Sequence, residues 1–428
     1  MIIAKDFGFL PQNSAEENSK ALQKAVDCGG DIYIDTPGVY NVCDAVEIGD
    51  DTSIYFCSGS YLKRNHAVGE TSYVFINKGA YSRTYNKNIK IEGLKIICND
   101  VVCGRMDENA KKVIMGLCGH ISFFYVKNLV LRDIEMLDLP AKDFGIQVCT
   151  FKNILIENVR IEGMKDAVHL GRGKDFVIRG GRFRTYDDPI ALNAHDYRIS
   201  NPQLGWIENG IIEDCYDYDY DADSTVGYFA RILAGAWVDW YSGMMVQNSD
   251  TVAYGGRLYR VMDALDCKEY KSVTPPTHTE GIKEYDGIKW IMIQDDVEYE
   301  AGCRNIVFRN IFLLKKRPIA FSIHFDKDCY SRSYYPNANS PVQENIVFEN
   351  IFVRNEIGKF LSAITPVNSV KIVNSTIGGS IEFRDIETEG IEYKPVKVLL
   401  SGNTFIDDKE RVICQGGRTV EVSESNNM

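Results

Sequence analysis

The stretch from Lys165 to Tyr197 carries a set of side chains suited to proton transfer. It contains Asp166, His169, Asp187 and Asp188. Carboxyl groups crowded into one site do not all ionise at neutral pH, because the charge of one raises the pKa of its neighbour. One carboxyl can then donate a proton while another, ionised, activates water or attacks a sugar, and glycoside hydrolysis needs this pair of roles. The alternatives for the same residues are a solvated acidic edge and a Ca²⁺ site.

A repeated phrase of six residues surrounds these aspartates. Its second and fourth residues are apolar in nearly every copy, which is the alternation of a β-strand. Its sixth residue is Gly, Asn or Asp, and these residues tolerate the left-handed backbone of a corner. The copies are NIKIEG from Asn88, NLVLRD from Asn128, NILIEN from Asn153, DFVIRG from Asp175, NGIIED from Asn209, NIVFRN from Asn305, NIVFEN from Asn345, SVKIVN from Ser369 and KVLLSG from Lys397.

The spacing of the copies gives the aspartates a common position. Successive copies begin 25 residues apart at Asn128 and Asn153, and 22 apart at Asn153 and Asp175, which is the length of one coil of a parallel β-solenoid. Stacked strands lie about 4.8 Å apart. Asp166 and Asp187 fall at nearly the same position of neighbouring coils, so we expect them to project from one wall together with Asp188.

The two ends of the repeat and its one long interruption complete the predicted architecture. Ser14 followed by an amphipathic pattern predicts a helix that ends at Gly29-Gly30 and covers the open end of the stack. The phrase is absent between residues 235 and 295, where Trp, Tyr and Gly are frequent. We therefore predict an all-β chain: a right-handed parallel β-helix with an N-terminal capping helix and a small inserted β-module. The parts span 1–234 with the active-site coils, 235–295 for the module and 296–428 for the remaining coils.

Two segments carry a resemblance to known proteins. The opening, with Asp6-Phe7-Gly8, a helix and a strand ending in Pro-Gly-x-Tyr, resembles the start of pectate-lyase-like β-helix proteins. KDAVHLG, followed one coil later by DDPIAL, resembles the central motif of polygalacturonase-like glycoside hydrolases, a TDGIH segment followed by a DDCIAI segment. The resemblance implies an inverting hydrolase in which Asp187 is the general acid, while Asp166 and Asp188 hold and activate water.

The chain departs from that motif at the substrate-binding positions. No Gly-His-Gly follows the paired aspartates, and the Arg-Ile-Lys motif survives only as Arg231-Ile232-Leu233. The missing Lys would pair, with the Arg, to a uronic carboxylate. The sequence therefore favours a neutral sugar such as galactose, xylose, arabinose or rhamnose, in a plant or bacterial polysaccharide or oligosaccharide.

The remaining candidates are substrate-binding residues. Alternating aromatic and acidic residues from Tyr216 to Asp223 suit a sugar-binding rim. In the inserted segment, which resembles the small β-modules of phage tail proteins and carbohydrate-binding repeats, we expect exposed Trp and Tyr side chains, among them Tyr254 and Trp290, to stack on sugar rings; a packed mini-core and a subunit contact are the alternatives. The predicted substrate-binding set is His169, Asn193, His195, Asp221, Arg231, Trp237 and Trp240.

Composition limits the partners of the chain. A net charge of −12 and a pI near 5.2 disfavour a nucleic acid as partner. The partner expected from the aspartate motif is a carbohydrate substrate. No apolar run reaches the ~18 residues of a membrane span, and the start lacks the pattern of a signal peptide. Twelve Cys without a CxxC pair indicate reduced thiols, so we expect a cytoplasmic protein, with export by another route left open.

Cofactor, assembly and activity leave alternatives. No organic cofactor is implied and no zinc-ligand spacing is present, whereas Ca²⁺ belongs to the alternative reading of the acidic cluster. The sequence does not decide whether the chain forms a homo-oligomer. The competing activities are a β-helix polysaccharide lyase or epimerase, which would use Lys or Arg as base and often Ca²⁺, and a noncatalytic, trimeric glycan-binding protein of the adhesin or tail-spike kind.

Overall fold

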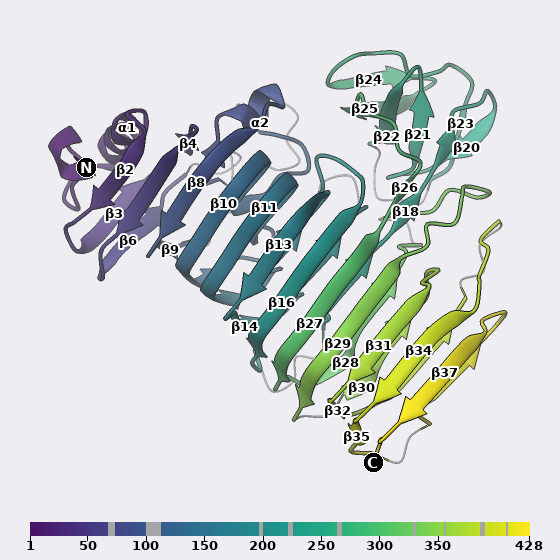
Figure 1. Cartoon of the computed structure of the whole chain (residues 1–428). Coiled ribbons are helices and arrows are strands. Elements are labelled where there is room, and N and C mark those ends of the chain that lie inside the picture. The colour runs from purple at the N-terminus through teal and green to yellow at the C-terminus, as the bar shows by residue number, and fades with distance from the viewer. Residues whose placement is uncertain are drawn as a thin grey trace.

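A computed structural model describes the chain in ten segments: residues 1–66, 73–99, 113–196, 200–220, 226–262, 268–327, 331–354, 357–385, 390–407 and 410–428. Most of these residues lie in β-strands, and 28 strands belong to one continuous sheet that coils along the molecule (Figure 1). Neighbouring coils pair in parallel throughout this sheet, which confirms the predicted parallel β-helix.

The repeated phrase builds one long face of the coil, seen at the front of Figure 1. Its strands align Ile89 with Leu129, Ile154 and Phe176, and further along align Ile306 with Ile346, as the period predicts. The strands of this face are β8 (Asn86–Glu92), β10 (Gly119–Leu139), β11 (Phe144–Gly163), β13 (Gly173–Arg179), β16 (Ile207–Asp217), β27 (Cys303–Leu313), β29 (Glu344–Val353), β31 (Ser369–Val373), β34 (Val396–Ser401) and β37 (Val420–Ser425).

Corners form at both ends of the phrase. The sixth residue has a left-handed backbone as predicted, with φ of 56° at Asp133 and 54° at Asn158. The first residue is left-handed as well, and its side chain pairs with the coil before it: the Asn128 amide donates to Asn88 and the Asn153 amide donates to Asn128, both at 2.8 Å. Asn is suited to this position because it tolerates a positive φ and both donates and accepts.

A second parallel wall, with shorter strands, positions the candidate site. Val168, Ile190, Ala230 and Phe321 align across it and face the hydrophobic core. The residues that follow them, including His169 and Arg231, point to the other side because side chains alternate along a strand. The strands of this wall are β12 (Val168–Leu170), β15 (Ile190–Asn193), β17 (Ala230–Leu233), β28 (Arg317–His324), β30 (Ile357–Ala363), β33 (Ser380–Arg384) and β36 (Val412–Gln415).

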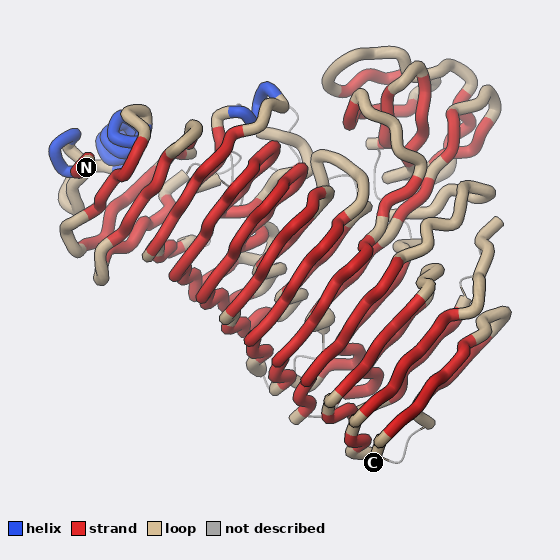
Figure 2. Tube along the Cα trace, in the orientation of Figure 1, coloured by secondary structure: helices blue, strands red, loops and turns tan. Residues whose placement is uncertain are grey.

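The N-terminal end carries helix α1 (Ala15–Val26), which lies beside the first strands (Figure 2). Ser14 and Glu17 form a reciprocal capping box at its start. Its buried face joins the main core through Ala21, Leu22 and Val26. The neighbouring elements are β1 (Ile2–Ile3), η1 (Ala4–Phe7), β2 (Gly30–Ile34), β3 (Gly38–Val42), β4 (Val46–Ile48), β5 (Thr52–Phe56), β6 (Ser60–Arg64), β7 (Phe75–Asn77) and α2 (Gly79–Ser82). Short strands complete the coils: β9 (Lys95–Ile97), β14 (Arg182–Thr185), β32 (Thr376–Ile377) and β35 (Thr404–Phe405).

Between β17 and β27 the chain forms three sheets of its own. They are the antiparallel pair β18 (Gly235–Ala236) and β26 (Glu300–Ala301), the pair β20 (Met244–Val246) and β23 (Tyr270–Ser272), and the sheet of β19 (Val238–Asp239), β21 (Thr251–Tyr254), β22 (Arg257–Val261), β25 (Ile288–Gln294) and β24 (Ile282–Tyr285). No helix among the described residues is long and apolar enough to cross a bilayer.

The expected exposure of the tryptophans in this module is wrong for two of them. Trp290 is fully buried in the core of the module, and Trp237 is 1% exposed and packs in the main core. Strands of an antiparallel sheet need one covered face, and large rings fill it well. Trp240 is partly buried and donates to Ser272, whereas Tyr254 is 36% exposed. Neither buried ring can stack on a sugar.

Candidate active site

Three aspartates meet where the chain enters two neighbouring strands of the second wall. Asp166 and Asp188 each lie two residues before a strand, β12 and β15, and the Ala167 N–H donates to the Asp188 carbonyl at 3.0 Å. One carboxylate oxygen from each of Asp166, Asp187 and Asp188 lies within 4.8 Å of the others. Asp166 and Asp188 are 2% exposed, whereas the Asp187 side chain is 27% exposed. Asp187 is therefore the most accessible member of the trio.

The three carboxyls differ in their sets of partners. Lys165 forms an ion pair with Asp187, and its Nζ lies 3.6 Å from Asp166 Oδ1. His169 Nδ1 lies 3.1 Å from the other oxygen of Asp166. The backbone N–H of Tyr228 donates to Asp188 Oδ1 at 2.7 Å. Lys165 stands directly before the aspartate of the first motif segment and was not recognised from the sequence as a site residue.

These partners move the pKa values of the three carboxyls in opposite directions. Burial opposes ionisation of Asp166, but Lys165, His169 and Arg231 outweigh it and lower the pKa of Asp166. Burial and the Asp166 charge raise the pKa of Asp187 against the pull of Lys165. Burial and both other aspartates raise the pKa of Asp188 well above its usual value. The trio thus combines one carboxyl whose pKa is lowered with two carboxyls whose pKa values are raised.

A second polar cluster adjoins the trio through His169 and Arg231. Arg231 Nη2 lies 3.0 Å from both oxygens of Asp326, and 3.7 Å from Asp196. Asp196 also lies 3.8 Å from His169 Nε2 and accepts from Asn193 Nδ2 at 2.6 Å. His169, Asn193 and Arg231 of the predicted set are therefore brought together. Asp196 was not selected from the sequence, although it directly follows His195, and Asp326 lies too far along the chain to be found by spacing.

The structure places the other predicted binding residues elsewhere. His195 is buried against the module, with its Nε2 3.5 Å from Thr251 Oγ1 and its ring 6.0 Å from that of Trp237. Burial and the charge of Arg260 lower the pKa of His195 well below its usual value, so the ring is neutral. Its contacts join the module to the coil. Asp221 lies outside the described residues.

The donor set of the trio favours proton chemistry over a calcium site. Ca²⁺ takes six to eight oxygen ligands, several of them carboxylates free to bind. Here Asp187 is paired with Lys165, and Asp188 accepts a backbone N–H. The Lys165 ammonium already supplies a positive charge among the carboxylates.

Lys315 supports the loop that carries Asp187 and Asp188. It belongs to a later coil, and its buried Nζ donates to the carbonyls of Thr185 at 2.8 Å, Tyr186 at 3.2 Å and Val226 at 3.5 Å. Burial, together with the charge of Arg317, lowers the pKa of Lys315 to about 8. An ammonium can make all three bonds, whereas the neutral amine has only two N–H groups.

We expect Lys315→Met to reduce kcat by roughly 10-fold to 10²-fold with little change in KM, because small displacements of catalytic groups cost this much. The ratio of wild-type to variant kcat should shrink between pH 6 and pH 9, since the wild-type ammonium titrates at about pH 8. Lys316→Met, at the exposed neighbouring position, is the matched control. A ratio independent of pH would contradict a role for the charged form.

Comparison with known proteins supports the fold. No protein-family model matches the chain. The family 28 exopolygalacturonase of Yersinia enterocolitica is similar with a TM-score of 0.55 and 15% identity, over 97% of this chain and 78% of that one. A hyperthermoactive exopolygalacturonase from Thermotoga maritima gives a TM-score of 0.56 and 12% identity, over 100% and 91% of the two chains. The chain thus shares the parallel β-helix fold of these two proteins.

A short sequence match points to a different protein. A glutamine–fructose-6-phosphate aminotransferase [isomerizing] of Halalkalibacterium halodurans is 28% identical over 102 residues, which is 23% of this chain and 17% of that enzyme. The same enzyme of Bacillus licheniformis matches with the same identity and coverage. The match spans less than a fifth of these relatives, so it gives no basis for assigning their activity to this chain.

Proposed function

We propose that this protein is a glycoside hydrolase that acts with inversion on a polysaccharide or oligosaccharide. The observation that carries the proposal is the trio of Asp166, Asp187 and Asp188, because neighbouring coils bring three carboxyls together and their surroundings move the pKa values apart. Carboxyls separated in this way into proton donor and proton acceptor are what glycosidic cleavage requires.

The roles follow from exposure and charge. Asp187 is the most exposed of the three and its pKa is raised, so it donates the proton to the leaving oxygen. Asp166 stays ionised, and it takes the proton from the attacking water. Asp188 is buried beside both and orients the water while sharing a proton with Asp187. His169 holds Asp166 in place through its Nδ1.

The charges around the trio support a neutral sugar as substrate. Among the described residues, five carboxyl groups lie in the two joined clusters, and the two cations in ion pairs with them are Lys165 and Arg231. A uronic acid would bring a further negative charge into this surplus, where Lys165 and Arg231 are already engaged. The carboxyls are Asp166, Asp187, Asp188, Asp196 and Asp326, and the cations are Lys165 and Arg231.

A screen of neutral aryl-glycosides and oligosaccharides tests the proposal. We expect release of new reducing ends from at least one of them, with the product anomer inverted as followed by NMR. An unsaturated product that absorbs in the ultraviolet would identify a lyase instead. Glycan binding without any turnover would identify a noncatalytic binding protein.

The Lys165–Asp187 ion pair gives the proposal a pH dependence. The general acid acts only when protonated, so kcat/KM falls as pH rises through the pKa of Asp187. Lys165 lowers that pKa. Lys165→Met should therefore move the alkaline limb of the profile upward by about 1 pH unit. Lys165→Arg keeps the cation and should leave the limb near its wild-type position. An unshifted limb in Lys165→Met would remove Asp187 as the group that titrates.

A further inference from the structure

Four lysines form a row across the front face of the coil. Lys87 in β8, Lys127 in β10, Lys152 in β11 and Lys174 in β13 are direct partners in the parallel register. All four are exposed. Strands in such a sheet lie about 4.8 Å apart, so the row places four positive charges at regular steps over about 14 Å along the coil axis.

This arrangement of charges is unlike the rest of the same face. A second row of charged residues lies five residues further along these strands, and its charges alternate between negative and positive. Its members are Glu92, Arg132, Glu157, Arg179, Glu213 and Arg309. Its members form ion pairs, such as Arg132 with Glu157 at 2.6 Å and Arg179 with Glu157 at 2.6 Å. Like charges directly opposite each other destabilise a sheet. Repulsion between the four lysines therefore destabilises this part of the sheet, whereas the neighbouring row avoids such repulsion.

No acid offsets this cost within the described part of the chain, where none of the four lysines has an ion pair. The acid that continues the row in register, Glu208 opposite Lys174, is paired with Arg304. At the other end, Asp50 accepts from the Asn86 amide. An external anion would relieve the repulsion.

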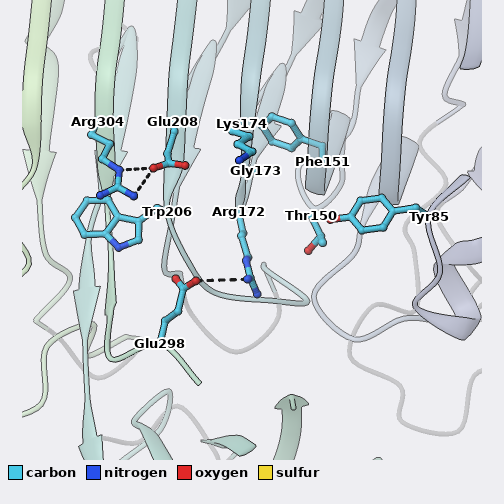
Figure 3. A pocket seen from close by; sticks show the side chains of 10 residues that line it. All are labelled: Tyr85, Thr150, Phe151, Arg172, Gly173, Lys174, Trp206, Glu208, Glu298 and Arg304. Carbon is cyan, nitrogen blue, oxygen red and sulfur yellow. Dashed lines mark hydrogen bonds and ion pairs between the residues drawn. The ribbon is translucent and has the colours of Figure 1, made fainter. Parts of the chain in front are cut away.

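A pocket of about 250 Å³ continues the row at Lys174 (Figure 3). Tyr85 and Trp206 flank it: Tyr85 is 43% exposed and has Lys127 Nζ 4.0 Å from its ring centre, and Trp206 is half-buried beneath Arg304 at 4.7 Å. Arg172 projects between them and pairs with Glu298 at 3.5 Å. The pocket joins aromatic rings to hydrogen-bonding groups of both charges, a combination suited to a sugar ring.

We propose that the lysine row and this pocket bind an acidic polysaccharide, with its carboxylates along the row and one sugar ring in the pocket. The row lies on a different face from the aspartate trio, because strand β12 and the corner at Gly171-Arg172 separate Asp166 from Lys174. The bound polymer is thus an anchor and not the cleaved chain, whose site disfavours acidic sugars. A nucleic acid fits less well, since four cations in one line engage few phosphates of a backbone.

Binding of alginate in calcium-free buffer, measured by affinity electrophoresis and calorimetry, tests this surface. We expect the wild type to bind alginate, to lose affinity steeply with added NaCl, and to ignore the neutral propylene glycol ester of the same polymer. Changing Lys127, Lys152 and Lys174 together to Ala should weaken binding at least 10-fold. Trp206→Ala should weaken it roughly fivefold through the lost ring contact.

The matched control changes Lys20, Lys24 and Lys371 to Ala, three exposed lysines outside the row, with the same change in net charge. It should bind like the wild type, and all variants should keep the wild-type unfolding midpoint. The proposal would be overturned if the neutral ester bound as tightly as alginate, or if the control lost as much affinity as the row variant. It would also be overturned if the row variant kept the wild-type affinity, or if single-stranded DNA competed as strongly as alginate. Turnover of small aryl-glycosides should not change in any variant, so this test and that of the proposed hydrolase activity fail independently.

Discussion

Asp187→Asn is expected to reduce kcat on natural glycosides by roughly 10²-fold to 10⁴-fold, because it removes the proton donor while keeping the size and shape of the side chain. The loss should be much smaller for an aryl-glycoside with an acidic leaving group such as dinitrophenol, which departs without protonation. This dependence on the leaving group separates loss of the acid from general damage to the site. Steady-state kinetics on the two substrates measures it directly.

The control for this experiment is Asp31→Asn, which changes an exposed carboxylate on β2 far from the site in the chain. It should leave both rates unchanged. Equal losses of Asp187→Asn on good and poor leaving groups would transfer the acid role to another residue. Asp188 is the alternative donor, because its pKa is raised as well.

The fold could be predicted because its information is local and repeated. Each copy of the phrase specifies a strand by alternation and a corner by its Gly, Asn or Asp, and the copies share one register from Ile89 to Ile346. The asparagine ladder was not predicted, since its purpose appears only when coils stack and the amide of Asn128 meets Asn88. Asn is the first residue of the phrase in most copies, so this recurrence could have indicated the ladder from the sequence.

The site could be predicted only in part, because only part of it comes from adjacent coils. Spacing brings Asp166 near Asp187 and Asp188, and the structure adds that the backbone of Asp166 aligns with Asp188 rather than with Asp187. Asp326 and Lys315 reach the site across the inserted module, and sequence distance gives no hint of such contacts.

Burial was the least predictable property of the candidates. The large apolar rings of Trp237 and Trp290 are suited both to stacking on a sugar at the surface and to packing in a core. Composition alone does not distinguish these two roles. The structure places both in cores. Two aromatic rings beside charged groups, the exposed Tyr85 and the half-buried Trp206, come instead from the coil itself.

Asp188 is the residue at which activity and stability should move in opposite directions. Its carboxyl is buried next to two other aspartates, and its pKa in the folded chain is well above the unfolded value of about 4. The folded protein therefore loses stability as pH rises from about 4 through the folded pKa, since the unfolded chain ionises more easily. A neutral side chain at this position escapes that loss.

Asp188→Asn should thus raise the free energy of unfolding at pH 8 by about 1 kcal/mol or more, because one unit of pKa shift corresponds to 1.36 kcal/mol. The amide oxygen can still accept the Tyr228 N–H, so no buried partner is stranded. The gain should shrink as pH falls toward 4, which urea unfolding midpoints at pH 8 and pH 4.5 would reveal, while kcat falls roughly 10²-fold. Asp31→Asn should change neither quantity. If Asp188→Asn is instead destabilised at pH 8, the surroundings of Asp188 stabilise its charged form. Asp188 would then be an ionised carboxylate and could not share a proton with Asp187.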